Sequence, residues 1–314
     1  MVDKAHAQIK GDGILVCENL FLNYGSKTIL SDININVPRG SVVGIVGANG
    51  AGKSTLLRCM AGLKQPQDGE VRLFGIPALA MSDAVRERIG FVAQTPDLFS
   101  WMTVEDHIRF IGQAYPQWDD DRAYQLTTRL SLPLRRQVSQ LSGGDQQKLA
   151  VILAMSHNPE LVLLDEPVSH LDPMTRREFM GALFDKDQSL FSTNDAIGFR
   201  DDPIRQPTVV ISSHLLSDLE PVVSHIAFMK SGRLQLFSKW EVILEKVRIV
   251  EKKDCSIPEQ LCISSNPNQH IFDLSKVIAS NQLNKQQKMA LESHSRALNS
   301  LDDLFIALNP PFWN

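Results

Sequence analysis

Hydrophobic and polar residues follow two patterns along the first third of the chain, and together they predict strands separated by helices. Ile33, Ile35 and Val37 alternate with polar residues over 31–37, at the two-residue period of a half-buried strand. The run VVGIV at 42–46 is apolar throughout, which is typical of a strand covered on both faces. Further strands are expected over 14–22, 69–75 and 89–93, and helices over 53–63 and 82–89.

Helical spacing replaces this alternation over about residues 95–158. Thr103 and Asp106 are spaced as a capping pair at the start of the first helical segment. Apolar residues recur at helical intervals over 103–115, 119–130 and 143–155. The region therefore predicts a helical insert within a larger domain.

Short apolar strands return after the insert, and they predict an α/β core that continues to about residue 240. The strands are LVLLDEP at 161–167 and TVVISSH at 208–214, with a helix over 172–184 between them. HIAFMK and RLQLF flank a Ser-Gly turn and predict a hairpin over 225–237. The polar, turn-rich residues 185–207 predict a long exposed loop.

The pattern is weaker beyond residue 240 and predicts a small α+β extension. Residues 240–254 favour a helix followed by a strand, and 293–309 end in an amphipathic helix. We therefore expect a main domain over 1–240 and a C-terminal extension over 241–314.

Composition narrows the class of protein. The 314 residues include 36 acidic and 32 basic side chains, a formal net charge of −4, which gives no electrostatic footprint for nucleic acid. No run approaches about 20 apolar residues, and the amino terminus lacks an apolar signal core, so neither a membrane span nor a secretion signal is expected. Four cysteines stand far apart or at a spacing that fits no common metal pattern, which favours reduced thiols in an intracellular protein: Cys17, Cys59, Cys255 and Cys262.

The stretch GANGAGKST, from Gly47 to Thr55, follows an apolar strand and precedes a helix, which is the context of a phosphate loop. Its three glycines let the backbone wrap closely around phosphate oxygens, and the helix start adds positive potential. Lys53 is placed to reach the β- and γ-phosphates, and the Ser54 hydroxyl to ligate Mg²⁺. The alternative is a chance glycine-rich turn, and the flanking strand and helix argue against it.

Three predicted strands end in polar side chains that suit nucleotide hydrolysis. Asp165 ends LVLLD, where a carboxylate can hold the magnesium of a nucleotide, and Glu166 follows, able to orient or deprotonate an attacking water. Gln94 follows the strand at 89–93, and His214 follows TVVISS. Each alone is more often an ordinary polar residue, but ligands bind at this edge of open α/β sheets, so together they predict a site.

A second glycine motif opens the helix in LSGGDQQKLA at 141–150. Glycine costs about 1 kcal/mol relative to alanine inside a helix, but at a helix start Gly143 and Gly144 leave backbone N–H groups free to meet an anion. The alternative is a flexible helix cap. Tyr24, expected in a loop after a strand, either stacks on adenine or is an ordinary half-buried tyrosine.

In this order along the chain, the motifs resemble those of ABC transporter ATPase subunits over about residues 14–238. The paired phosphate-loop and LSGG motifs are very specific for that family. The resemblance implies a P-loop ABC ATPase core with a mostly parallel sheet, an N-terminal antiparallel β subdomain and the helical insert. It also implies ATP and Mg²⁺ as cofactors.

The resemblance implies a role for each matching position. The residues implied for nucleotide contact are Tyr24, Gly47, Asn49, Gly50, Ala51, Gly52, Lys53, Ser54, Thr55 and Asp165, with Ser142, Gly143 and Gly144 of the LSGG signature. Those implied for magnesium are Ser54, Gln94 and Asp165. Those implied for hydrolysis are Glu166, His214 and Gln94, and Asp172 matches the D-loop of the family.

The family implies two protein partners. Two subunits pack head to tail, so that Ser142 and the amides of Gly143 and Gly144 would face the γ-phosphate held by the other subunit, which explains a second glycine motif. Because no span is expected in this chain, the permease would be a separate integral-membrane protein, with this chain peripheral on the cytoplasmic face of the bacterial inner membrane. Its contact is expected on the helical insert and at Phe99, Trp101 and Met102.

Segments around the signature and at the end of the chain resemble bacterial ATPases of the type-2 export class, which serve the export of drugs, antibiotics, peptides, lipids or glycans. A soluble ABC-type ATPase acting in translation, DNA or Fe–S handling is the alternative. An inactive regulatory cassette is disfavoured, because all expected catalytic positions are filled.

The sequence departs from the family at Asp145, where glutamine is usual, at Lys148, where arginine is common, and in the length of the loop 185–207. Asp145 either brings a carboxylate close to the expected phosphate or caps its own helix. We expect slower turnover or looser dimer closure, without loss of activity.

Overall fold

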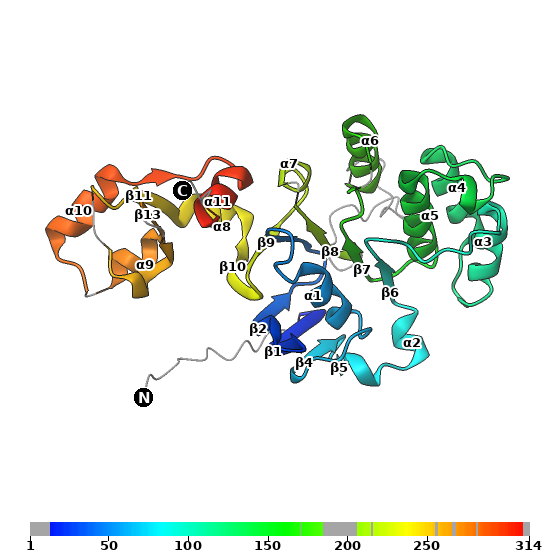
Figure 1. Ribbon diagram of the computed structural model, residues 1–314, viewed down its shortest axis with the longest axis horizontal. Helices are drawn as coiled ribbons and strands as arrows, with labels where there is room; N and C mark the ends of the chain where they lie inside the picture. Colours follow the sequence, from blue (N-terminus) through cyan, green and yellow to red (C-terminus); the bar gives the residue numbers. More distant parts are fainter. Residues whose placement is uncertain are drawn as a thin grey trace.

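A six-stranded sheet lies at the centre of the computed structural model, which describes residues 13–169, 171–184, 206–214, 216–254, 257–265, 268–280 and 282–309 (Figure 1). Its strands run in the order β10 (Arg233–Lys239), β9 (His225–Lys230), β3 (Val42–Val46), β8 (Thr208–Ser213), β7 (Leu161–Asp165) and β6 (Ile89–Val92). All neighbours pair parallel except β10, which pairs antiparallel with β9. The predicted α/β core is confirmed, and the carboxyl ends of the parallel strands meet at one edge.

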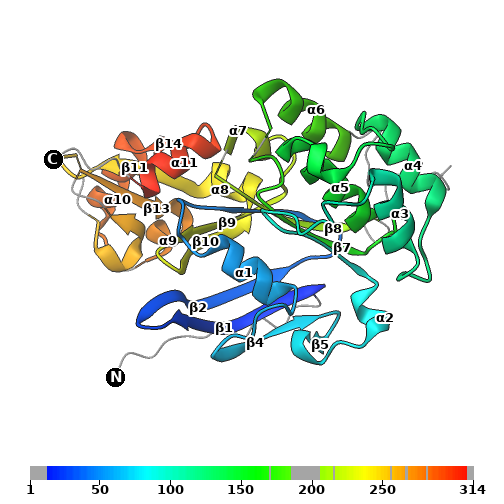
Figure 2. The same ribbon diagram turned by 45° about the vertical axis from the view of Figure 1, so that its right-hand side comes forward.

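An antiparallel sheet forms a second layer and confirms the expected N-terminal β subdomain. Its strands run in the order β2 (Lys27–Val37), β1 (Leu15–Tyr24), β4 (Asp68–Leu73) and β5 (Ile76–Pro77). Helix α1 (Lys53–Met60) lies between the two sheets (Figure 2), and its buried Leu56, Leu57, Cys59 and Met60 join side chains of both in one core.

Three helices occupy the range predicted for the helical insert: α3 (Val104–Gly112), α4 (Asp120–Arg129) and α5 (Gly143–Met155). The predicted capping pair is present, since the Asp106 N–H donates to the Thr103 hydroxyl at 3.1 Å and the Thr103 N–H donates to Asp106 Oδ2 at 3.4 Å. The other helical elements among the described residues before 240 are the 3-10 turns Ala78–Ala80 and Val138–Gln140, and α2 (Asp83–Arg86), α6 (Pro173–Phe184) and α7 (Leu216–Leu219).

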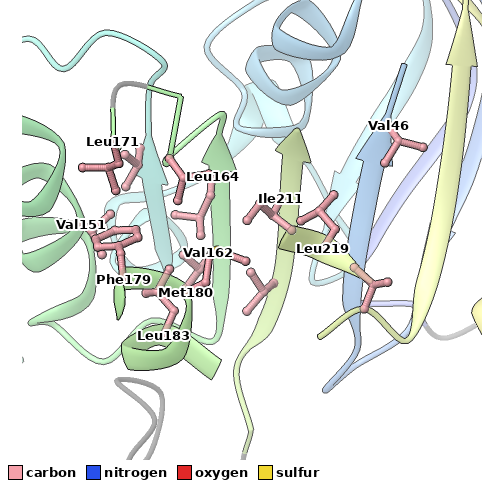
Figure 3. Close-up of a cluster of buried hydrophobic side chains, with 14 of the residues drawn as sticks. Val46, Val151, Val162, Leu164, Leu171, Phe179, Met180, Leu183, Ile211 and Leu219 are labelled. Carbon is pink, nitrogen blue, oxygen red and sulfur yellow. The ribbon is translucent and has the colours of Figure 1, made fainter. Parts of the chain in front are cut away.

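Strand β7 shows why the central sheet needs unbroken apolar runs. Leu161 and Leu163 belong to the core that contains α1, whereas Val162 and Leu164 belong to the core on the opposite face. Successive side chains of a strand point to opposite faces, so a strand covered on both sides favours apolar residues along its length, and β7 turns polar only at Asp165, its last residue. The second face is covered by α5 and α6, with Phe179 of α6 packed among the buried side chains (Figure 3).

The C-terminal extension contains a separate antiparallel sheet of order β12-β13-β11-β14. Its elements are α8 (Trp240–Lys246), β11 (Val247–Glu251), the 3-10 turn Glu259–Leu261, β12 (Cys262–Ser265), β13 (Gln269–Asp273), α9 (Leu274–Ala279), α10 (Lys285–His294), β14 (Arg296–Ala297) and α11 (Leu301–Leu308). The expected helix followed by a strand is present as α8 and β11, and the final amphipathic helix as α11. A small core belongs to the extension alone: Val250, Ile257, Phe272, Val277, Leu283 and Leu291.

Helix α11 returns from the extension to the central sheet. The Lys230 ammonium at the end of β9 donates to the Leu308 carbonyl at 2.7 Å, and the rings of Phe228 and Phe305 meet edge to face at 5.9 Å. Leu304 of α11 is fully buried in the same core as Phe228. We propose to keep 1–240 and 241–314 as the two structural units, although one core continues across that boundary.

Replacing Leu304 with alanine tests this shared core. Truncating a buried leucine to alanine lowers the free energy of unfolding by about 2–5 kcal/mol, so the variant should unfold at a clearly lower denaturant concentration. The matched control is Ile306→Ala on the same helix, where the side chain is 59% exposed and the change should stay within about 0.5 kcal/mol. Equal stability of both variants in equilibrium denaturation would show that α11 does not share the core.

The described cysteines are free thiols, with Cys17 and Cys59 buried and Cys262 half-buried. Burial raises the pKa of Cys59 to about 11 and also raises that of Cys17, so neither is a reactive thiolate at neutral pH. Cys255 and all but two residues of the predicted loop 185–207 lie outside the described residues. None of the described helices is long and apolar enough to cross a lipid bilayer.

Candidate active site

The predicted phosphate loop connects β3 to α1, and its glycines are required either by close backbone contacts or by their backbone conformation. Gly52 has φ 102°, and a Cβ there would lie 2.7 Å from the Ile29 carbonyl oxygen. A Cβ on Gly47 would lie 2.4 Å from the Met229 carbonyl oxygen. Gly50, with φ 79°, faces open space, so it is needed for its backbone conformation and not for lack of room. The loop therefore wraps tightly, as phosphate binding requires.

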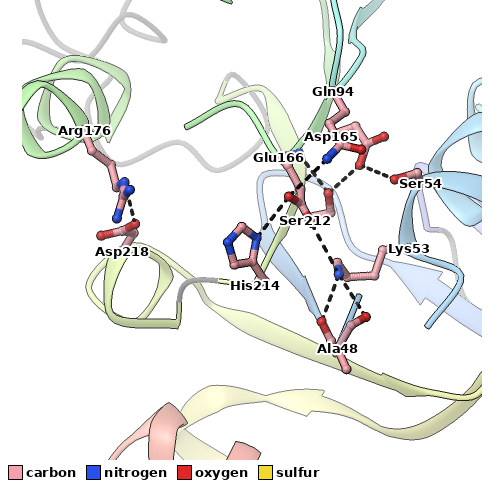
Figure 4. Close-up of polar contacts among 11 residues, drawn as sticks. Ala48, Lys53, Ser54, Gln94, Asp165, Glu166, Arg176, Ser212, His214 and Asp218 are labelled. Carbon is pink, nitrogen blue, oxygen red and sulfur yellow. Dashed lines mark hydrogen bonds and ion pairs between the residues drawn. The ribbon is translucent and has the colours of Figure 1, made fainter. Parts of the chain in front are cut away.

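Lys53, the first residue of α1, points its ammonium back into the loop. Its Nζ donates to the Gly47 carbonyl at 2.9 Å and to the Ala48 carbonyl at 3.3 Å, and it lies 3.4 Å from Glu166 Oε1 (Figure 4). The Lys53 side chain is only 4% exposed. A buried cation held by two carbonyls and one carboxylate provides a strong, oriented site for a phosphate anion.

Asp165 ends β7 beside α1 and carries a buried carboxylate. Its Oδ1 accepts hydrogen bonds from Ser54 Oγ at 3.0 Å and Ser212 Oγ at 2.7 Å, while its Oδ2 has no hydrogen-bond partner within the described part of the chain. Burial raises the pKa of the Asp165 carboxyl, and the two serine hydroxyls oppose that rise. An unpaired carboxylate oxygen next to a serine hydroxyl fits the oxygen ligands that Mg²⁺ prefers.

Glu166 is held from three sides. Its Oε2 lies 3.0 Å from His214 Nδ1 and accepts from Gln94 Nε2 at 3.4 Å, and its Oε1 faces Lys53 (Figure 4). Its backbone has φ 46°, in the left-handed region that costs a non-glycine residue roughly 1–3 kcal/mol, and its N–H donates to Ser212 Oγ at 3.0 Å. The backbone turn directs the carboxylate toward Lys53 and His214.

A cavity of about 440 Å³ opens between the phosphate loop and these strand ends. It is lined by Tyr24, Lys27, Ile29, Asn49, Gly50, Gly52, Lys53, Ser54, Thr55, Gln94, Glu166, Ser169 and His214. The structure therefore brings together most of the residues predicted for nucleotide contact and hydrolysis. Asp165 and Ala51 are buried behind them, at 0% and 4% exposure. The Gln94 amide N–H donates to Glu166. The contact of Gln94 with magnesium stays a prediction.

Two expectations about aromatic and apolar residues were wrong. Tyr24 does not follow a strand in a loop but is the last residue of β1, where the hairpin to β2 holds it at the cavity, 46% exposed. Met102 offers no contact surface, because it is 8% exposed and packs in the interior. Phe99 and Trp101 are exposed as expected, at 45% and 67%, and Phe110 of α3 joins them.

The LSGG segment lies outside this cavity. The Ser142 hydroxyl accepts the Asp145 N–H at 3.1 Å and caps α5, while Ser142 and Gly143 are exposed and Gly144 is buried. The Asp145 carboxylate lies 3.4 Å from Lys148 Nζ on the same helix. Asp145 therefore interacts within its own helix, but Ser142 and not Asp145 is the capping residue. The approach of the Asp145 carboxylate to a phosphate held by a second copy stays a prediction.

Sequence reasoning missed Ser212, which joins Asp165 to the backbone of Glu166. Its hydroxyl donates to the Asp165 carboxylate and accepts the Glu166 N–H. The available signal was the pair of serines that ends the apolar stretch in TVVISS, since a fully buried hydroxyl requires hydrogen-bond partners.

Comparison with known proteins agrees with this geometry. A protein-family model described as "ABC transporter" matches residues 30–169. The bacitracin transport ATP-binding protein BcrA of Enterococcus faecalis is 31% identical over 224 residues, which are 70% of this chain and 68% of that protein. The chain belongs to the ABC transporter ATP-binding proteins. It is an ABC ATPase, which takes ATP together with Mg²⁺.

Other relatives of this ABC ATPase differ in the process they serve. The methionine import ATP-binding protein MetN of Protochlamydia amoebophila is 32% identical over 65% of this chain and 58% of that protein. An uncharacterized ABC transporter ATP-binding protein, YxlF of Bacillus subtilis, is 25% identical over 93% of this chain and 98% of its own length. A dimeric ATP-binding cassette solved after hydrolysis with ADP and Pi aligns with a TM-score of 0.60 at 26% identity, covering 72% of this chain and 98% of that one.

Proposed function

We propose that this ABC ATPase powers export through a separate membrane permease, with the substrate a drug, antibiotic, peptide, lipid or glycan. The proposal is supported by the bacitracin-transport relative and by the segments that resemble the export class. The methionine-import relative is the main argument for the opposite direction. A soluble ATPase without a permease remains the alternative function.

The observation that carries the hydrolytic role is the Glu166 carboxylate, held by Lys53, His214 and Gln94 at the edge of the cavity. In the proposed reaction Glu166 orients a water and takes its proton as the oxygen attacks the γ-phosphorus, and ADP leaves. His214 holds the carboxylate in place, and Lys53 neutralises phosphate charge. Magnesium, held by Ser54 and Asp165, would neutralise charge on the phosphate oxygens.

The position of the LSGG segment supports a site completed by a second copy. Ser142 and Gly143 are exposed at the start of the thirteen-residue helix α5 but do not line the cavity beside Lys53. Head-to-tail packing of two copies would bring this helix start to the phosphate held by the other copy, where its free N–H groups favour an anion. We therefore propose a nucleotide-sandwich dimer.

The exposed aromatic cluster of Phe99, Trp101 and Phe110 is the proposed permease contact. Phe99 lies at its centre, 6.1 Å from Trp101 and 5.6 Å from Phe110 between ring centroids. Exposed aromatic side chains of this kind commonly contribute most of the binding free energy of an interface.

Replacing Trp101 with alanine should weaken permease binding by about 30-fold, because such aromatic residues contribute about 2 kcal/mol or more. Basal ATPase activity should stay unchanged, since Trp101 is 67% exposed and does not line the nucleotide cavity. Pull-down of the co-expressed permease measures the effect, and Met289→Ala, at 62% exposure on α10, is the matched control. Equal permease recovery with both variants would argue against this contact surface.

Transport assays in membrane vesicles distinguish export from import. Inside-out membrane vesicles carrying the ATPase and the membrane protein that copurifies with it should accumulate labelled bacitracin, the first probe, when ATP is added outside. ATP-driven loss of a preloaded probe from these vesicles would indicate import. Absence of any copurifying membrane protein would favour the soluble alternative.

A further inference from the structure

Helices α6 and α7 begin just after two segments that reach the nucleotide cavity. Ser169 lines the cavity, and Asp172, three residues later, caps α6 by accepting the N–H groups of Met174 and Thr175, each at 3.1 Å. His214 lines the cavity and contacts Glu166, and α7 begins two residues later, at Leu216. A contact between α6 and α7 therefore couples the position of Ser169 and Asp172 to that of His214.

Arg176 makes that contact. Its Nη2 donates to the Leu171 carbonyl at 3.1 Å, in the turn before α6, and its Nε lies 3.5 Å from Asp218 Oδ2 on α7 (Figure 4). The planar guanidinium of Arg176 thus contacts the turn before α6 through Nη2 and α7 through Nε. Lysine has no such fork, because its ammonium is a single point of charge.

The ion pair is largely shielded from water, since the side chains of Arg176 and Asp218 are 18% and 14% exposed. Arg176 Nε and Asp218 Oδ2 have no hydrogen-bond partner within the described ranges, so the attraction between them is what offsets their burial. Burial raises the pKa of the Asp218 carboxyl, and Arg176 acts against that rise. Removing Arg176 takes away the cation that lies 3.5 Å from the buried Asp218 carboxylate, and removing Asp218 leaves Arg176 Nε without its carboxylate partner.

Helix α7 is also anchored on the side of the C-terminal extension. The Leu301 N–H, at the start of α11, donates to Glu220 Oε2 just after α7 at 3.2 Å, and Leu219 is fully buried in the core shared with α11. Arg176 adds a second contact to α7, on the side of the α6 turn. His214 lies two residues before this short helix, which is contacted both from the α6 turn and from α11.

We propose that Arg176 is a positioning residue for ATP hydrolysis, which ties the Leu171–Asp172 turn to α7 and so keeps His214 aligned with Glu166. The inference rests on the proposed roles of Glu166 and His214. Arg176 itself does not line the cavity, so its effect is transmitted through the turn and α7. A change in the Asp172 turn is passed to His214 through this guanidinium.

Steady-state ATPase assays of Arg176→Gln test the proposal. We expect kcat to fall roughly 3- to 30-fold, which corresponds to a coupling of about 0.65–2 kcal/mol, with KM for ATP within about twofold of the parent value. Asp218→Asn should give the same pattern from the α7 side, and it carries the test if Arg176→Gln does not fold. The double variant should be no slower than the slower single variant, because both remove one interaction.

The neighbouring Arg177→Gln is the matched control, because Arg177 is an exposed arginine on the same helix and should keep kcat within about twofold. A normal kcat in folded Arg176→Gln, or a loss that adds fully to that of Asp218→Asn, would overturn the proposal. Assaying His214→Ala in the same way distinguishes a failure of the role proposed for His214 from a failure of the role proposed for Arg176. Full hydrolysis in His214→Ala would overturn the role proposed for His214, whereas its loss beside a normal Arg176→Gln would overturn only the role of Arg176.

Discussion

Glu166→Gln should retain ATP binding and lose almost all hydrolysis, with turnover reduced roughly a hundredfold to ten-thousandfold. Glutamine has the shape of glutamate and can still hydrogen-bond with His214 and Gln94, but it cannot take a proton from water. The buried position supports a large effect, since Glu166 is 7% exposed and makes close contacts with Lys53 and His214. With hydrolysis blocked, the ATP-bound dimer should accumulate.

Phosphate release measures the loss of hydrolysis, and size-exclusion chromatography with Mg²⁺-ATP measures the dimer. The matched control is Glu160→Gln, since Glu160 precedes the amino end of the same strand, β7, and its side chain is 46% exposed and paired with Arg39 and Arg88. This control should hydrolyse ATP at the parent rate. Parent-like turnover in Glu166→Gln would remove that residue from the proposed role, and a monomer with bound Mg²⁺-ATP would argue against the sandwich dimer.

Lys53→Ala should weaken ATP binding itself, by about tenfold to a hundredfold. A charge-assisted hydrogen bond contributes about 1.5–3 kcal/mol, and the Lys53 ammonium is the buried cation that the phosphate loop encloses. The variant also leaves the Glu166 carboxylate without its cationic neighbour, so hydrolysis should fall at saturating ATP as well.

Isothermal titration with Mg²⁺-ATP tests the Lys53 prediction directly. Arg58→Ala is its matched control, because Arg58 is an exposed cation in the last turn of the same helix. ATP affinity should be close to the parent value in this control. An unchanged affinity in Lys53→Ala would contradict the assignment of the phosphate loop.

Much of the site could be predicted because its parts are local or lie at strand ends. The phosphate loop is one continuous stretch whose glycines, lysine and serine act within nine residues, from Gly47 to Thr55. Gln94, Asp165 and His214 come from distant parts of the chain, but each ends or follows a strand of one parallel sheet. Parallel strands place such ends at one edge, so identifying the strands was enough to bring the residues together.

Several features escaped prediction because they depend on which surfaces meet. The burial of Met102 and the exposure of Phe110 follow from how the insert packs, and both have ordinary helical or loop contexts in the sequence. The strands β12 and β14 are only four and two residues long, too short to show a period. The return of α11 to Phe228 joins residues about eighty positions apart.

The amino-acid sequence by itself determined the α/β core, the phosphate loop and the group of polar strand ends, because residue spacing and nearest neighbours encode each of them. Only the tertiary structure decided that Ser212 links Asp165 to Glu166, that Arg176 joins the α6 turn to α7, and that α11 shares the main core. These contacts form between segments that meet only after the sheet and its covering helices have closed. Their energies depend on burial and distance, which no local pattern specifies.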